Sequence, residues 1–246
     1  MIIRTAATTL GPRRKRQSQR FLLYPSHDLL RSQDYADNAG RAGDPMARPL
    51  TTVDLDRLGL ASAFSTATAV KAGLTRSLLD RLVRDGNLER LGRGVFLRSE
   101  YVDTVDTDLV EIAVRVPAAT ICLASALARH GLSDEIPAAV DLALPRNRWS
   151  PAVATRVTWH RFAEDTFAVG RQALAVADTL TIGLYSAERS IIDAFRTRGT
   201  TGFDLATEAL RRWLRTPAHQ PAHLLSLCRH WPRTQTSLRN ALEILL

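Results

Sequence analysis

The sequence predicts an α+β protein in which a small N-terminal domain precedes a larger domain of mixed helices and strands. Residues 51–98 show three short helical patterns, followed by two strand-like runs joined by glycines. Residues 103–246 mix helical and β-prone segments and end in four helical patterns. The chain has 246 residues, of which 45% are hydrophobic and 24% charged. That composition is typical of a globular protein, and the length suits one or two domains.

Residues 1–47 show neither helical nor strand periodicity and contain a basic stretch at positions 13–16. We interpret them as a disordered or wrongly assigned N-terminal extension. The basic stretch is then a solvated tail, and contact with phosphate is the alternative. Met46 is the only methionine besides Met1, and the patterned sequence begins just after it. Translation that starts at Met46 is therefore a second interpretation of the same segment.

Residues 48–101 are predicted to form the small domain. Threonine or serine residues at positions 51 or 52, 65 and 75 are suited to cap three short helices. In the third helix, leucine and valine recur at helical spacing, while arginine, serine and aspartate fall on the opposite arc. Residues 88–91 and 95–98 read as two strands joined by the turn Gly92-Arg93-Gly94. Three helices followed by a hairpin are the order of a winged helix-turn-helix domain.

Charge favours a polyanionic partner for this end of the chain. The formal net charge is +8, and the sequence pI is about 10.4. Residues 1–50 hold nine basic and four acidic residues, whereas residues 101–246 hold sixteen and fifteen. Arg93, at the tip of the predicted wing, is positioned to reach phosphate or the minor groove. The alternative is that this arginine and those of the third helix are ordinary solvated surface residues.

Residues 102–246 are predicted to form a mixed α/β domain with a small sheet and a helical C-terminal part. Its predicted helices are 107–116, ended by Pro117, and 124–130. Residues 120–123 form a short apolar run. The β-prone runs are 140–144, 155–161 and 180–185, and the closing helices are 187–196, 203–214, 222–231 and 236–245. The many apolar residues of this segment are sufficient for a core of its own.

The sequence points to no catalytic, cofactor-binding or metal-ligating set. It contains no Gly-Lys pair for a phosphate loop, and the Gly92 turn has no third glycine for a dinucleotide fingerprint. Cys122 and Cys228 lie far apart without a CxxC spacing. His219 and His223 are four residues apart, but Pro221 between them disfavours a shared helix face.

Two alternatives to a purely DNA-binding role stay open. One is an enzyme, a nuclease or a transferase that modifies another protein, within residues 102–246. Its best candidate residues are Asp141, Arg146, Arg189 and Asp193, although the spacing of the last two favours a structural ion pair. The other is a regulator that senses a small ligand, which would be detected as ligand-induced thermal stabilisation.

No apolar run reaches the roughly 18 residues that a membrane-spanning helix requires. The apolar run at residues 21–24 is too short for a signal peptide. We therefore expect a cytoplasmic protein.

Several blocks of residues resemble a known family. Phe64-Ser65, Gly73 and residues 82–96 are similar to the N-terminal winged helix of AbiEi-type antitoxins of type IV toxin–antitoxin systems. Residues 123–127, 131–137, 142–145 and 188–193 look like the C-terminal domain of those antitoxins. The resemblance covers roughly residues 50–246.

The resemblance implies an antitoxin that also represses its own two-gene operon by binding inverted repeats in double-stranded DNA. Its C-terminal domain would oppose a nucleotidyltransferase-like toxin, and direct contact with that toxin stays open. By motif position, the DNA-contact role falls on Arg76, Ser77, Arg81 and Arg84 of the third helix and on Arg90 and Arg93 of the wing. Asp80, on the same arc, departs from an ideal DNA-binding face: it would accept a hydrogen bond from cytosine or pair with Arg76 or Arg84.

Overall fold

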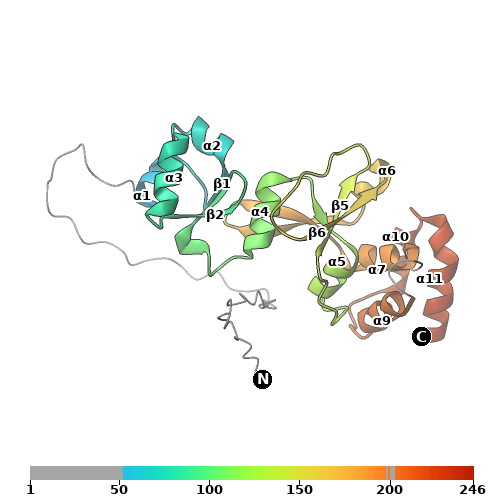
Figure 1. The fold of residues 1–246 in the computed structure, drawn as a ribbon. Helices are drawn as coiled ribbons and strands as arrows, with labels where there is room; N and C mark the ends of the chain where they lie inside the picture. Colours follow the sequence, from blue (N-terminus) through green and yellow to red (C-terminus); the bar gives the residue numbers. More distant parts are fainter. Residues whose placement is uncertain (1–51, 198, 200–202) are drawn as a thin grey trace, which may run out of the picture. The chain divides into compact units, whose positions relative to one another are not determined.

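The predicted α+β fold is confirmed by a computed structural model, which describes residues 52–197, 199 and 203–246 (Figure 1). The whole of the expected N-terminal extension, residues 1–47, therefore lies outside the described residues, and so does Met46, the alternative start of translation. The described residues belong to one unit, residues 43–246. None of the described helices is long and apolar enough to cross a bilayer.

The winged helix-turn-helix forms from residues 52–98. Its elements are α1 (Thr52–Arg57), β1 (Ala63–Ser65), α2 (Thr66–Lys71), α3 (Arg76–Arg84), β2 (Leu88–Gly92) and β3 (Val95–Arg98). The strands form an antiparallel sheet in the order β1-β3-β2. Strand β1 was not predicted, because three residues are too few to show a period of two. Its position depends on distant pairing, in which Phe64 lies opposite Phe96.

Local sequence explains the helices of this domain. The Ser65 hydroxyl accepts a hydrogen bond from the Thr68 amide at 3.1 Å, which caps α2 as predicted. Gly73 has a φ of +95°, a conformation that favours glycine and ends the helix. Of the small residues in α2, Ala69 is fully buried, which permits close packing against the core, whereas Ala67 is exposed.

The second domain is built on a five-stranded sheet. Its first part contains a 3-10 turn η1 (Ser99–Tyr101), α4 (Thr107–Arg115), β4 (Thr120–Ile121), α5 (Leu123–Arg129), β5 (Val140–Pro145), β6 (Val157–Phe162), α6 (Glu164–Phe167), β7 (Arg171–Ala177) and β8 (Leu180–Tyr185). The strand order is β6-β5-β4-β8-β7. Strands β5 and β6 are parallel, as are β4 and β8, while the β4–β5 and β7–β8 pairs are antiparallel.

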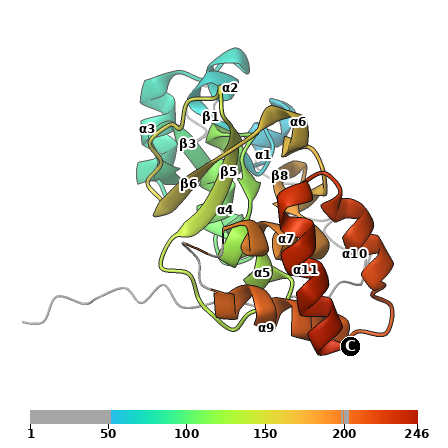
Figure 2. The ribbon, with the colours of Figure 1, turned by 90° about the vertical axis from the view of Figure 1, so that its right-hand side faces the viewer.

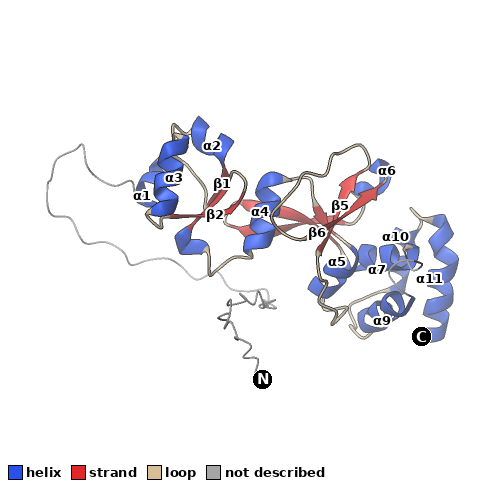
Figure 3. Ribbon diagram, viewed as in Figure 1, coloured by secondary structure: helices blue, strands red, loops and turns tan. Residues whose placement is uncertain are grey.

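The C-terminal part is helical, as predicted. It contains α7 (Ala187–Arg196), α9 (Phe203–Leu214), α10 (Pro221–Cys228) and α11 (Pro232–Leu245), and the last three contact α7 (Figures 2 and 3). Their shared core includes Phe195, Trp213 and Leu238. The sequence placed the start of the last helix four residues too late, because Pro232 was not recognised as a first-turn residue. It also extended α10 to Trp231, whereas the helix ends at Cys228.

Helix α4 packs on both sheets. Val110 clusters with Ala63 and Leu97 of the winged helix. Leu109 and Ile112 belong instead to the cluster beneath the five-stranded sheet. The winged helix is therefore packed directly against the first helix of the second domain.

Candidate nucleic-acid interface

Helix α3 presents a polar face because its apolar face is fixed in the core. The Thr75 hydroxyl accepts a hydrogen bond from the Leu78 amide at 3.2 Å and caps the helix. Leu79 and Leu82 are 1% and 2% exposed, and they pack against the rest of the winged helix. Burial of these two side chains directs the opposite arc, including Arg76 and Arg84, to solvent.

All six residues that the sequence assigns to DNA contact are exposed. They are Arg76, Ser77, Arg81 and Arg84 on α3, Arg90 on β2 and Arg93 in the turn between β2 and β3. Helix α3 and strand β2 of the wing are in contact through an ion pair, in which Arg90 Nη2 lies 2.5 Å from Asp80 Oδ1 of α3. The Arg90 guanidinium also lies over the Phe96 ring, with its carbon 5.1 Å from the ring centroid.

Acidic side chains neutralise part of this surface. Asp80 pairs with Arg90 across the two elements, rather than with Arg76 or Arg84 as the sequence suggested. Arg81 Nε lies 3.5 Å from Asp85 Oδ2 one turn further along α3. All four side chains are at least 45% exposed, so each pair contributes at most about 1 kcal/mol. Residues 75–97 contain five arginines and three acidic residues, and the surface keeps a positive excess.

The wing is held from two sides. The Gly94 carbonyl accepts a hydrogen bond from the Thr66 amide of α2 at 2.8 Å. On the other side, Arg115 of α4 donates from Nη1 to the Arg93 carbonyl at 2.6 Å. The Arg93 side chain itself is exposed at the turn. The contacts to the backbone therefore fix the turn while its guanidinium remains free to meet a ligand.

A buried carboxylate lies at the base of the wing. Glu111 of α4 is 1% exposed, and a Cβ added to Gly92 would lie 2.2 Å from its Oε1. The same carboxylate accepts hydrogen bonds from the amides of Ala154 and Thr155, at 2.8 and 2.9 Å. This role was not predicted from the sequence, since a single glutamate on an amphipathic helix is usually exposed. The only local signal is the glycine that leaves room for it.

Two of the four residues considered as candidates for an enzyme site, Arg189 and Asp193, are buried, unlike the proposed DNA contacts. The side chains of Arg189 and Asp193 have no exposed surface, and their Nε and Oδ2 atoms lie 2.8 Å apart. Arg189 also donates to the carbonyls of Thr166 and Val169, at 2.8 and 2.7 Å. Its guanidinium carbon lies 4.1 Å from the ring centroid of Trp231. These contacts tie α6 and the turn that follows it to the helical part, which supports the structural interpretation of the pair.

The other two candidate residues, Asp141 and Arg146, do not form a shared site with Arg189 and Asp193. Asp141 Oδ1 lies 2.8 Å from His160 Nε2, and its amide donates to the Ser125 hydroxyl at 2.8 Å. Arg146 is exposed just after β5. A surface pocket shared by all four residues would need Arg189 and Asp193 to be accessible, and they are not.

Histidines and cysteines have local roles in this structure. His219 stacks on Trp213, with ring centroids 4.7 Å apart, and its Nδ1 lies 2.8 Å from the Trp213 carbonyl. Among the described residues, no group of three His, Cys, Asp or Glu side chains is placed to hold a metal ion. Cys122 and Cys228 are buried free thiols, and burial raises the pKa of both.

The three helices and antiparallel sheet of residues 52–98 define a winged helix-turn-helix domain. A comparison with protein-family models matches residues 48–99 to the family described as "Transcriptional regulator, AbiEi antitoxin". Over these residues the chain is similar to this regulator and antitoxin family, which agrees with the resemblance of the winged-helix blocks. The blocks at residues 123–193 lie outside the match. The match ends before α4 and covers less than a quarter of the chain. A search of the curated proteins finds no match to this chain.

Proposed function

We propose that this protein is the antitoxin of a type IV toxin–antitoxin system and a DNA-binding autorepressor of its own operon. The observation that carries the proposal is the exposed row of arginines on α3 and the wing, within the segment matched by the family model. A recognition helix of this kind enters the major groove, and a wing contacts the flanking backbone or minor groove. The proposal requires no catalytic group and places the protein in the cytoplasm with its operator.

The proposed DNA contacts are Arg76, Ser77, Arg81, Arg84, Arg90 and Arg93. The first four lie on the helix that would enter the groove, and the last two lie on the wing. The operator is double-stranded DNA upstream of the protein's own gene, and inverted repeats are the arrangement implied by the family resemblance. Residues 102–246 supply the antitoxic activity against a nucleotidyltransferase-like toxin.

The first test is binding of the full chain to a labelled duplex from the region just upstream of the gene, compared with unrelated DNA of equal length. We expect selective binding that weakens steeply with salt, because arginine contacts to phosphate release counterions. Arg81→Ala should weaken operator binding by about 1–3 kcal/mol if its side chain reads a base. Arg239→Ala, which removes an exposed arginine from α11, is the matched control and should bind as the native protein does.

Equal affinity for both duplexes, or no effect of Arg81→Ala together with Arg76→Ala, would contradict the proposed recognition surface. The antitoxin role needs a separate measurement, in which growth is followed when the toxin gene of the same operon is expressed with each variant. We expect the α3 variants to lose repression and to retain neutralisation. Failure of the native chain to relieve toxicity would refute the antitoxin assignment without affecting the DNA result.

A further inference from the structure

The loop between β5 and β6, residues 146–156, carries an unusually exposed aromatic residue. Trp149 is 84% exposed. Among the described residues between positions 137 and 243, it is the one large apolar side chain with such exposure. Trp159, in the strand that follows, is partly buried against the core beneath the sheet. A single exposed apolar residue is normal on a protein surface and does not by itself indicate a binding site. The residues near Trp149 in the sequence therefore have to show whether it belongs to one.

Those surroundings are positively charged. Residues 142–163 contain four arginines and no acidic residue, although residues 101–246 as a whole are nearly balanced. All four are exposed: Arg146, Arg148, Arg156 and Arg161. None of them forms a salt bridge with a carboxylate in the part of the chain that the structure describes. Their charge is therefore available to a ligand, in contrast to that of Arg81 and Arg90 on the winged helix.

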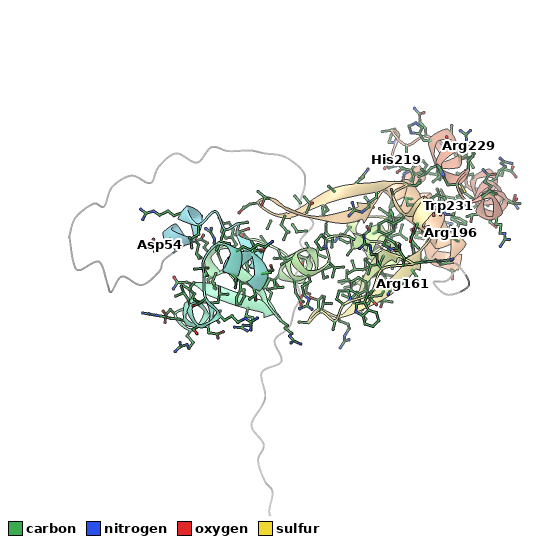
Figure 4. The ribbon with its side chains drawn as sticks, turned by 90° about the horizontal axis from the view of Figure 1, so that it is seen from above. Asp54, Arg161, Arg196, His219, Arg229 and Trp231 are labelled. Carbon is green, nitrogen blue, oxygen red and sulfur yellow. The ribbon has the colours of Figure 1, made fainter. Side chains whose placement is uncertain are left out.

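The loop is also held in place. Arg161, labelled in Figure 4, lies on the edge strand β6 and donates from Nη1 to the Arg148 carbonyl. Its Nη2 donates to the Ser150 hydroxyl at 2.8 Å. Both partners are direct neighbours of Trp149 in the sequence. The indole is thus presented by a fixed stretch of backbone, which reduces the entropy lost when a ligand binds.

We propose that residues 146–150 bind single-stranded nucleic acid, with a base stacked on Trp149 and the phosphates beside Arg146 and Arg148. Aromatic side chains between arginines are suited to this ligand, because every unpaired base offers a π-face and every nucleotide a negative charge. Duplex DNA fits less well, since its bases are stacked on one another and present only their edges. This site lies outside the segment matched by the family model and does not depend on DNA binding by α3.

A protein partner is the less favoured occupant. Protein interfaces are organised around a buried apolar centre, with energetically important aromatic residues surrounded by further contacts. The residues that directly precede Trp149 along the chain, Arg146, Asn147 and Arg148, are all exposed. One indole among cations and amides matches a nucleic-acid surface more closely than a protein interface.

The test uses the full chain and labelled oligomers of deoxythymidylate and uridylate of about 12 nucleotides, which form little structure of their own. Fluorescence anisotropy should show binding, and Trp149→Ala should weaken it by about 5- to 160-fold, the range that corresponds to the loss of one stacked base. Trp149→Phe should retain most of the affinity because the ring can still stack. Arg148→Ala should lower the dependence of log affinity on log salt by about 0.7.

Two controls separate this proposal from the operator-binding proposal. Ile136→Ala removes another exposed apolar side chain, 74% exposed, and should leave oligomer binding unchanged. Binding of the upstream duplex by Trp149→Ala should equal that of the native chain. Absence of oligomer binding by the native chain would overturn the proposal, as would equal affinity of native and Trp149→Ala proteins. The proposal would also be overturned if the native chain bound no oligomer and Trp149→Ala lost binding to the toxin. That result would assign the loop to a protein partner.

Discussion

Gly92→Ala is expected to destabilise the protein because the added methyl group would collide with a buried carboxylate. Gly92 ends β2, and its φ lies outside the left-handed region, so backbone strain does not contribute. The new Cβ would lie 2.2 Å from Glu111 Oε1 and 2.8 Å from Cδ. Carbon atoms in favourable contact are about 3.5–4.0 Å apart, so one of the two groups must move.

The contacts of Glu111 set the size of the effect. Its carboxylate accepts bonds from the Ala154 amide, the Thr155 amide and the Thr155 hydroxyl, at 2.8, 2.9 and 2.8 Å. A shift that relieves the collision weakens at least one of them, and a hydrogen bond to a charged group contributes about 1.5–3 kcal/mol. With the strain of overpacking, about 1–3 kcal/mol, we expect Gly92→Ala to lower the free energy of unfolding by about 2–4 kcal/mol.

Urea unfolding followed by tryptophan fluorescence measures this loss, and a double-mutant cycle tests its cause. In the Glu111→Ala background the colliding atoms are gone, so the added Gly92→Ala change should cost less than about 0.5 kcal/mol. A second comparison is Gly86→Ala, where φ is +76° and nothing lies within 4 Å of the added Cβ. That change should cost only the left-handed strain, about 1–2 kcal/mol, in either background. Additive effects of Gly92→Ala and Glu111→Ala would refute the reasoning.

Three further outcomes are expected. Asp80→Asn should change stability by less than about 1 kcal/mol, because its pair with Arg90 is exposed, but it should raise DNA affinity and steepen its salt dependence in an anisotropy titration. Asp193→Asn should lower the free energy of unfolding by about 3–5 kcal/mol in urea, because Arg189 is left buried beside a neutral group; a loss below 1 kcal/mol would contradict this. Burial raises the pKa of Cys228 from 9.0 to about 11, so between these values only the unfolded thiol ionises and stability should fall as pH rises. The urea midpoint should therefore fall less steeply with pH in Cys228→Ala than in the native protein between pH 9.0 and about 11. An equal fall in both proteins would contradict the raised pKa of Cys228.

The sequence predicted the features that depend on neighbours along the chain. Ser65 and Thr75 cap the helices for which they were proposed, since a cap involves residues only two or three positions away. Leu79 and Leu82 are buried because helical spacing alone places them on one face. The exposure of the six proposed DNA-contact residues follows from the same periodicity, while their function stays a prediction.

Features that depend on distant residues were missed for a physical reason. Strand β7, Arg171–Ala177, is an edge strand rich in alanine, and most of its residues are exposed or only partly buried, so it shows little alternation. It forms by pairing with β8. The partner of Asp80 was misjudged because helical spacing offered Arg76 and Arg84, whereas Arg90 approaches through the fold of the wing.

The winged helix and the second domain are linked at the wing, and this bears on how the proposed DNA binding would be controlled. The segment matched by the family model ends at residue 99, yet the wing is held by residues beyond that point. Arg115 binds the Arg93 carbonyl, and Glu111 fills the space beside Gly92. Glu111 also accepts a hydrogen bond from the Thr155 amide in the loop before β6, so the same carboxylate lies against the wing and this loop. Since a buried carboxylate keeps its position only while its hydrogen bonds persist, a change in this loop that released Glu111 would also free the base of the wing.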